Sequence, residues 1–516
     1  MKHYKILIIF MLFVLATSCS KDFIDNPPED NITVDNFYNN DEQVLAGSAS
    51  MYNYPWFHFN SVFILCLDVY AGNALGSYSD IVEFENFAVN QGNQMASEAW
   101  QSFFLVVAFA NNQLYALENK IGPDVSEDVK NWSRGESLFM RALAYFYLVR
   151  TYGAVPILED VSIYGTDAPI YRNTVEDVYT FIIRDLTEAA DLLPPSWAAS
   201  NAGRVTSGAA NGLLAKVYLT RGDYANTLTY ANKVIGSNLY SLLPNYGNIF
   251  NHPEYNNCAE SVFELQFVAP AQGSHWGYTN THQAYLAGAG RITGAGDGWA
   301  TFVPSNDLLR DYEPNDQRRY YTVMEEGNYY PDLCTTDGGF TVENALGGSN
   351  YVAFRKYVIG SNAEYSNIGF MNTDINTHIL RYADILLMRA EAILGTSTST
   401  TDVTALGDIN AVRARAGLPA LTSVTLDDIL HERRMEFVIE GDRWYDLARI
   451  NRSEAIDILS NTDRAYLVDS NDPNSGTGDG RFVVPTESDF LLPIPVSETD
   501  INPLLKEEPV PYEFTK

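Results

Sequence analysis

Apolar residues recur at helical spacing over much of this chain. Between residues 100 and 120 they fall three and four positions apart, and the same period returns at 127–152. A capping sequence at 173–177 introduces a further helix, which the pair Pro194-Pro195 ends. The pattern predicts a mostly α-helical protein whose helices come in pairs.

One segment has the composition of a tight helical hairpin. Residues 207–219 carry small side chains, a Gly-Asp-Tyr turn follows, and alanines mark a second helix at 225–235. Small side chains let two backbones approach closely, and glycine accepts the turn geometry. The pattern returns loosely at 379–394 and 403–416. The hairpins resemble tetratricopeptide units, so we expect stacked hairpins, with unrelated helical pairs as the alternative.

The middle of the chain loses the helical period. It is rich in Gly, Asn, Tyr and Pro, and residues 262–267 alternate like a strand. Long loops on a rigid frame often carry binding sites. We therefore predict a loop-rich ligand lobe with a few short strands at 238–376, inserted between a helical scaffold at 41–237 and a second scaffold with the tail at 377–516.

The amino terminus predicts a lipoprotein signal peptide over residues 1–18. Two lysines precede ten apolar residues at 6–15. As a helix these would rise only about 15 Å, half of a bilayer core. Small residues then lead to Cys19, as a lipoprotein signal peptidase requires. Cys19 is therefore predicted to carry the lipid and residues 19–40 to form a tether, with an ordinary secretory signal as the alternative.

The net charge and the cysteine content exclude several classes of function. The formal net charge is -32, and a surface this acidic repels nucleic acid and anionic headgroups, so we expect membrane attachment by the lipid alone. The four cysteines include no CxxC pair, which excludes a zinc ribbon and gives no support for a disulfide framework. No cofactor is predicted, and a structural Ca²⁺ among the acidic loops stays open.

Charged and aromatic motifs follow one another in a fixed order along the chain. They lie at residues 136–156, 210–235, 304–308, 381–392, 410–419, 432–437, 440–449, 491–495 and 502–503. Together with the cysteine motif they resemble the SusD/RagB family, outer-membrane lipoproteins of Bacteroidetes. The resemblance implies a helical scaffold with a loop-rich ligand lobe. It also implies a lipid-anchored protein on the cell surface that hands oligosaccharides, or in some members peptides, to a TonB-dependent SusC-like barrel without chemistry on them.

Two loop clusters combine aromatic rings with polar side chains, which is what the apolar faces and hydroxyl rims of sugars require. In the family that the chain resembles, ligand aromatics come from about these two regions. The candidate ligand contacts are Asp68, Tyr70, Asn73, Tyr78, Trp276, Tyr278, Tyr285, Arg291 and Trp299.

A dense charged motif at 432–446 suggests an active site as the rival hypothesis. Residues 432–436 can instead pair along a helix, and Asp442, Arg443 and Asp446 could bridge helices nearby, so the motif can be structural. A helical glycoside hydrolase would need two carboxylates across a cleft, about 5–10 Å apart. The sequence has no HExxH, GxSxG or P-loop motif. We therefore predict no catalytic residues and a glycan-binding protein, with a peptide binder or a glycoside hydrolase as the alternatives.

Overall fold

Helices dominate this protein in its computed structural model, and the prediction of a mostly α fold is confirmed. The strands that the model describes pair two by two. Cys19, Trp276 and the predicted signal peptide lie outside the described part of the chain. The structure describes residues 37–159, 161, 169–269, 277–343, 346, 352–365, 368–466 and 480–514.

The amino-terminal part consists of helices that pack against their neighbours in the chain, with α6 on α7, α7 on α8 and α8 on α9. Side-chain caps define where the long helices begin: Asn93 accepts a bond from the Ala96 amide, and Ser126 accepts one from the Val129 amide. The helices of this part are α3 (Asp41–Ala49), α4 (Ile64–Tyr70), α5 (Ser79–Glu85), α6 (Gln94–Asn119), α7 (Glu127–Tyr152), α8 (Val175–Leu192), α9 (Ser207–Thr220) and α10 (Tyr224–Gly236).

The predicted hairpin is formed by α9 and α10. Gly222 takes a φ of +72° in the turn, and the Asp223 carboxylate caps α10 by accepting a bond from the Asn226 amide. A Cβ on Gly212 would lie 2.6 Å from Cδ2 of Leu380, so a larger residue would require the side chain of Leu380 to move where α9 approaches β8 (Thr377–Arg381). The second predicted hairpin is also present, but residues 379–381 belong to a strand and not to its first helix.

Short strand pairs and single-turn helices replace the long helices in the middle of the chain. The alternation predicted at 262–267 corresponds to β2. The pairs are β1 (Ala74–Gly76) with β3 (Phe302–Pro304), β2 (Ser261–Leu265) with β8 (Thr377–Arg381), β4 (Val323–Met324) with β7 (Ala353–Phe354), and β5 (Tyr329–Tyr330) with β6 (Phe340–Thr341). The short helices are α11 (Asn248–Asn251), α12 (His282–Leu286), α13 (Gly290–Thr293), α14 (Asn306–Asp311) and α15 (Gln317–Thr322).

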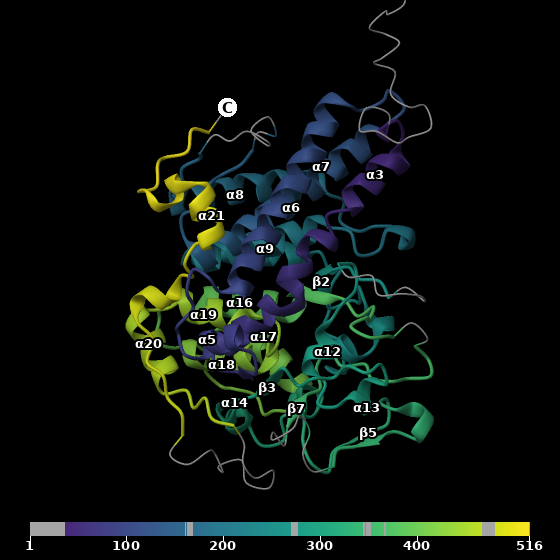
Figure 1. Cartoon of the computed structure of the whole chain (residues 1–516), viewed down its shortest axis with the longest axis vertical. Coiled ribbons are helices and arrows are strands. Elements are labelled where there is room, and N and C mark those ends of the chain that lie inside the picture. The colour runs from purple at the N-terminus through teal and green to yellow at the C-terminus, as the bar shows by residue number, and fades with distance from the viewer. Residues whose placement is uncertain are drawn as a thin grey trace, which may run out of the picture.

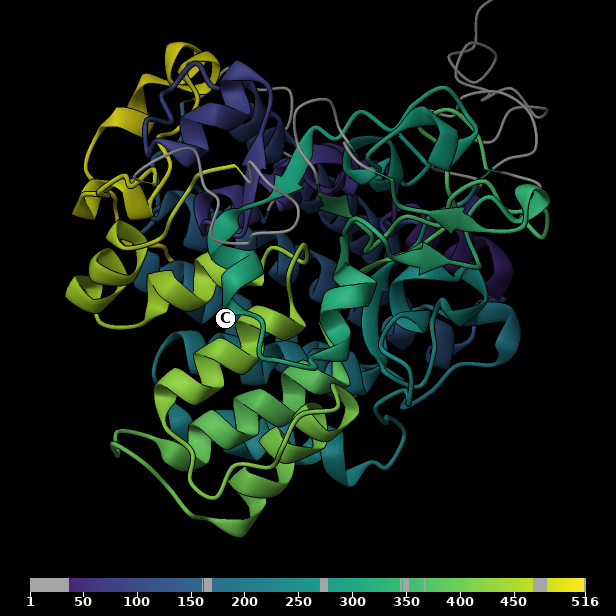
Figure 2. The ribbon, with the colours of Figure 1, turned by 90° about the horizontal axis from the view of Figure 1, so that it is seen from below.

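The carboxyl-terminal part returns to helices, and α16 packs against α10 of the first hairpin. In Figure 1 the loop-rich segment with α12 and α13 lies at the lower right of the helical frame. Figure 2 shows it on the opposite side from the yellow-green helices of this part. These are α16 (Tyr382–Leu394), α17 (Val403–Arg415), α18 (Leu426–Glu436), α19 (Asp442–Arg449), α20 (Arg452–Ser460) and α21 (Val496–Ile501).

The domain boundaries at residues 41, 238 and 377 stay predictions. Among the helices that the structure describes, none combines the length and the apolar character needed to cross a bilayer.

A buried ion pair crosses the β2–β8 ladder, which joins the loop-rich segment to α16. Glu264 and His378 are cross-strand partners, both side chains are fully buried, and their charged groups lie 2.9 Å apart. Burial by itself lowers the pKa of an imidazole, but the negative charge of Glu264, together with hydrogen bonds to Cys258 and Glu264 and the charge of Glu440, outweighs it and raises the pKa of His378 to about 9. The same pair lowers the pKa of Glu264 against the effect of its burial.

We expect this pair to make the stability of the protein depend on pH. Because the pKa of His378 rises from 6.5 to about 9 on folding, its contribution is complete below pH 6.5 and is lost as the pH approaches 9. The free energy of unfolding should fall by about 3 kcal/mol between pH 6 and pH 9. Urea unfolding of the wild type and of His378→Asn measures this, and the variant should lack most of the change. An equal change in both proteins would contradict the assignment.

Candidate functional site

Three of the predicted ligand residues lie in the interior. Asp68 accepts bonds from the Asn73 amide group at 2.8 Å and from the backbone of Gly441 at 2.9 Å, and burial raises its pKa to about 6. Tyr70 stacks on Trp444 with ring centroids 3.9 Å apart. These contacts join α4 to the carboxyl-terminal helices, so the site described below leaves out Asp68, Tyr70 and Asn73.

Three aromatic side chains pack together at the surface around α12, and Tyr78 lies near them. The Trp299 ring, 39% exposed, contacts the Tyr285 ring edge to face at 5.4 Å and the Phe370 ring at 5.7 Å. Phe370 and Tyr78 are 51% and 54% exposed. Burial raises the pKa of Tyr285 to about 12, and the nearby Tyr78 and Glu98 add to the rise. Edge-to-face packing holds such rings in place while leaving their outer faces accessible.

A second exposed pair lies next to this group. Tyr54 and Tyr278 are each 44% exposed and stack with centroids 5.4 Å apart. Gly277 has a φ of +104°, and a Cβ there would lie 3.0 Å from the Tyr54 ring, so glycine is needed beside the stack.

One hydrogen bond brings the two groups together. The Thr279 hydroxyl donates to the Met371 carbonyl at 3.0 Å, and these residues directly follow Tyr278 and Phe370 in the chain. The six rings therefore form one region, which we call the aromatic surface; its members are Tyr54, Tyr78, Tyr278, Tyr285, Trp299 and Phe370.

The structure thus brings Tyr78, Tyr278, Tyr285 and Trp299 together, as one site requires. Arg291 instead faces Glu343, at 3.4 Å, and its guanidinium lies over the Phe340 ring. Sequence reasoning missed two members of the aromatic surface, Tyr54 and Phe370. Phe370 lies in a loop more than seventy residues from Trp299, and no periodicity marks it. Tyr54 had one signal, its place in an aromatic-rich segment before α4.

Polar groups lie near the aromatic surface. His58 and Glu98 are 3.5 Å apart, and the Gln94 amide donates to the same carboxylate at 2.7 Å. Burial tends to raise the pKa of Glu98, but these bonds outweigh it and lower the pKa. Within the described residues, no group of three or more His, Cys, Asp or Glu side chains has the arrangement of a metal site.

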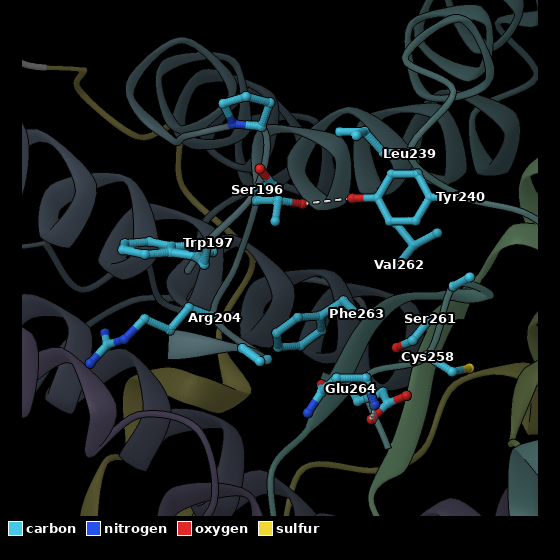
Figure 3. Close-up of a pocket in the computed structure, with 16 residues that line it drawn as sticks. Ser196, Trp197, Arg204, Leu239, Tyr240, Cys258, Ser261, Val262, Phe263 and Glu264 are labelled. Carbon is cyan, nitrogen blue, oxygen red and sulfur yellow. Dashed lines mark hydrogen bonds between the residues drawn. The ribbon is translucent and has the colours of Figure 1, made fainter. Parts of the chain in front are cut away.

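A separate cavity of about 260 Å³ opens between the α8–α9 loop and β2. Figure 3 shows Trp197, Tyr240 and Phe263 around it, with Ser261 and Cys258 on the side of β2. Rings and polar groups converge both at the aromatic surface and in this cavity.

Comparisons with known proteins identify the family. A model described as "SusD family" matches residues 259–510, and one described as "Starch-binding associating with outer membrane" matches residues 22–219. A SusD-like protein of Bacteroides ovatus is 34% identical over 99% of both chains. The chain belongs to the SusD family. The resemblance inferred from the ordered motifs is thereby confirmed.

Two other members carry information on ligands. One protein, whose crystal structure contains a xylogluco-oligosaccharide, has 33% sequence identity to this chain. The match covers 92% of this chain and 100% of that one, and the two structures superpose with a TM-score of 0.83. The starch-binding protein SusD of Bacteroides thetaiotaomicron is 27% identical over 72% of this chain and 71% of its own length. SusD-family proteins are binding proteins and not enzymes, in agreement with the prediction of no catalytic activity.

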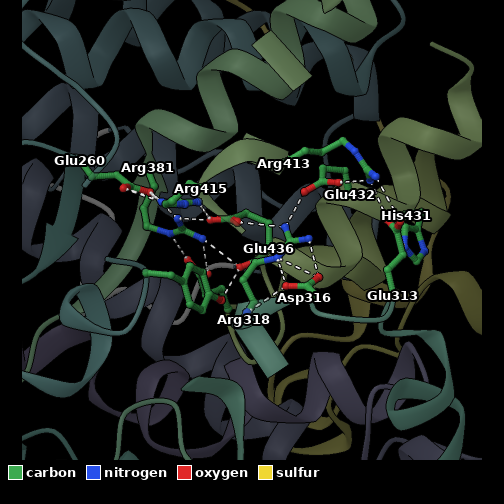
Figure 4. Close-up of polar contacts among 12 residues, drawn as sticks. Glu260, Glu313, Asp316, Arg318, Arg381, Arg413, Arg415, His431, Glu432 and Glu436 are labelled. Atoms are coloured by element: carbon green, nitrogen blue, oxygen red, sulfur yellow. Dashed lines mark hydrogen bonds and ion pairs between the residues drawn. The ribbon is translucent and has the colours of Figure 1, made fainter. Parts of the chain in front are cut away.

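The charged family motif forms a buried ion-pair network (Figure 4). Glu436 pairs with Arg381 at 2.7 Å and with Arg415 at 2.5 Å. Glu432 pairs with Arg318 at 2.5 Å and with Arg413 at 3.1 Å. The sequence suggested pairs along one helix for residues 432–436, whereas the partners of these two carboxylates come from other elements. The expected bridge between helices is present, since Arg433 of α18 pairs with Asp446 of α19 at 2.7 Å. Carboxylates that are already paired with buried arginine side chains are not available for acid–base chemistry.

We expect the loss of one cation from this network to be costly. Arg381→Met leaves Glu260, Glu436 and Glu440 without their shared partner in a fully buried site. The free energy of unfolding should fall by about 3–5 kcal/mol, measured by urea unfolding. The matched control is Arg291→Met, which breaks an ion pair whose side chains are both more than half exposed, and should cost less than about 1 kcal/mol. Equal losses in the two variants would show that the network contributes no more than a surface pair.

Proposed function

We propose that this protein is a lipid-anchored outer-membrane lipoprotein that captures neutral glycan chains on its aromatic surface and hands them to a TonB-dependent SusC-like transporter. The observation that carries the proposal is the set of six exposed or half-buried rings around α12, five of which pack against one another as a stacked pair and a group of three.

Sugar rings present apolar C–H faces that stack on aromatic faces, while their hydroxyls bond to polar groups at the edge. The Tyr54–Tyr278 stack and the Trp299 group fix ring faces before a ligand arrives. Preorganised side chains lose little conformational entropy on binding, so more of the contact energy appears as affinity. His58 and Gln94, close to Tyr285 through Glu98, supply polar groups for hydroxyls.

The charge of the chain favours a neutral ligand. A formal net charge of -32 repels anionic polymers at long range. The relatives that bind xylogluco-oligosaccharide and starch support a neutral glucan over the alternative, a peptide. Saturation of the charged motif in ion pairs supports a protein that holds its ligand unchanged and speaks against a glycoside hydrolase.

Delivery to a transporter follows from attachment at the membrane. The lipid on Cys19 and the tether at 19–40 keep the ligand site close to the outer membrane, on the cell surface. A stable complex with a barrel needs an interface of more than about 2,000 Å², which a helical frame of this size can offer.

Binding to defined glycans tests the ligand part of the proposal. Lipid-free protein should bind xylogluco-oligosaccharides or another neutral glucan by calorimetry, and chromatography should show no product. Trp299→Ala should weaken binding by about tenfold, which is about 1.4 kcal/mol, because it removes the central ring face. Tyr115→Ala removes an exposed ring outside the aromatic surface and should change nothing. The same calorimetric measurement is made with other glucans, including starch and laminarin, and with a panel of peptides.

Each other outcome rejects a part of this proposal. Product formation would identify a hydrolase, and binding of peptides alone would identify the peptide-binding alternative. Unchanged glucan affinity in Trp299→Ala would remove the aromatic surface from the site.

Membrane attachment has its own test. Cys19→Ala should move the protein from the membrane fraction to the soluble fraction, because the thiol that carries the lipid is gone. The control is Cys258→Ala, which leaves the lipid attachment residue in place and should keep the protein in membranes. Membrane retention of Cys19→Ala would exclude a lipid anchor at that residue.

A further inference from the structure

The cavity between the α8–α9 loop and β2 has the chemistry of a sugar site. Trp197 is fixed by two contacts: its indole N–H donates to the Val205 carbonyl at 2.8 Å, and its ring packs edge on against Trp132 at 5.1 Å. Across the cavity the Tyr240 hydroxyl lies 2.8 Å from the Thr206 hydroxyl (Figure 3). Fixed aromatic rings and hydroxyl groups therefore face the same space.

Each charged side chain that lines the cavity is already paired with a group of opposite charge. Arg204 is the one basic residue among the lining residues, all of which are described. Its guanidinium donates to both oxygens of Glu136 at 3.0 Å and to the Leu45 carbonyl at 2.6 Å. Glu264 pairs with His378. Because neither charge is free, the cavity suits a neutral ligand and not an anion.

Its size restricts the ligand further. A volume of about 260 Å³ lies below the range of sites for drug-sized molecules, about 300–1,000 Å³. The cavity therefore takes a small unit, about one sugar ring.

A short stretch of chain connects the cavity to the aromatic surface. Gln266 exchanges two bonds of 2.9 Å with Asn257, which lines the cavity, and lies against Gly203 on its rim. Two residues later, the Val268 amide donates to the carbonyl of Tyr278 at 3.3 Å. Two residues span at most about 7 Å. The rim of the cavity and the Tyr278 end of the aromatic surface are thus close neighbours along this stretch.

We propose that the cavity is a second subsite, which holds one neutral sugar unit of the same glycan chain that lies on the aromatic surface. The inference rests on the proposed function and extends it. A ligand long enough to reach both places gains affinity without any new contact on the aromatic surface, since its second contact is intramolecular. The protein would then select long chains over short ones.

The test compares a short and a long xylogluco-oligosaccharide by calorimetry. Trp197→Ala removes a ring face of the cavity, and Ser196→Leu fills its exposed rim. Both should weaken binding of the long probe by about three- to tenfold and leave the short probe unchanged. Ser200→Leu, at an exposed serine that does not line the cavity, should change neither. Trp299→Ala should weaken both probes, and thermal unfolding checks that each variant is folded.

The outcomes separate the two proposals. The cavity is not a second subsite if Ser196→Leu binds both probes as the wild type does. It is also not a second subsite if both cavity variants weaken the two probes equally. Both conclusions hold independently of the result for Trp299→Ala. If the wild type binds neither probe, nor the other neutral glucans of the panel, the proposed function fails and the subsite fails with it. A folded Trp299→Ala variant with wild-type affinity for the short probe overturns the aromatic surface alone.

Discussion

The buried charges around α18 are the constraint on which this fold depends. Consecutive residues of that helix reach different parts of the chain: Arg433 pairs with Asp384 and Asp446, while Arg434 pairs with Asp307 and Asp311. Ions that have left water are stable only when each partner is present. An arrangement of these segments that separates the partners therefore leaves uncompensated charges in the interior, which costs stability.

This constraint extends to the aromatic surface through buried polar residues that connect the two. The Arg434 guanidinium donates to Asn73 at 2.9 Å, next to β1. β1 pairs with β3, which begins three residues after Trp299. The helical frame thus fixes the strand that precedes α5 and the loop that presents the central ring. The backbone that carries the exposed rings is therefore connected to the charge network through β1 and β3.

The interior and the surface of this molecule differ in chemistry: charged groups inside are paired with one another, whereas aromatic rings and hydroxyl groups are exposed at the surface. Carboxylates and guanidiniums neutralise one another inside, which leaves no free acid–base pair in the network of α18. The aromatic surface and the cavity beside it present ring faces and hydroxyls, which suit a ligand that is held and released unchanged.

The sequence by itself determined the helical frame, the tight hairpin at α9 and α10, and the family, because helical periodicity, glycines at close approaches and ordered motifs are local properties. It also pointed to Tyr278, Tyr285 and Trp299, which the structure places on one surface and whose contact with a ligand stays a prediction. Only the tertiary structure decided which rings face water: Tyr70 is buried under Trp444, whereas Tyr54 and Phe370 join a surface made by distant segments. The exposure of a ring depends on what packs over it, and that partner lies elsewhere in the chain.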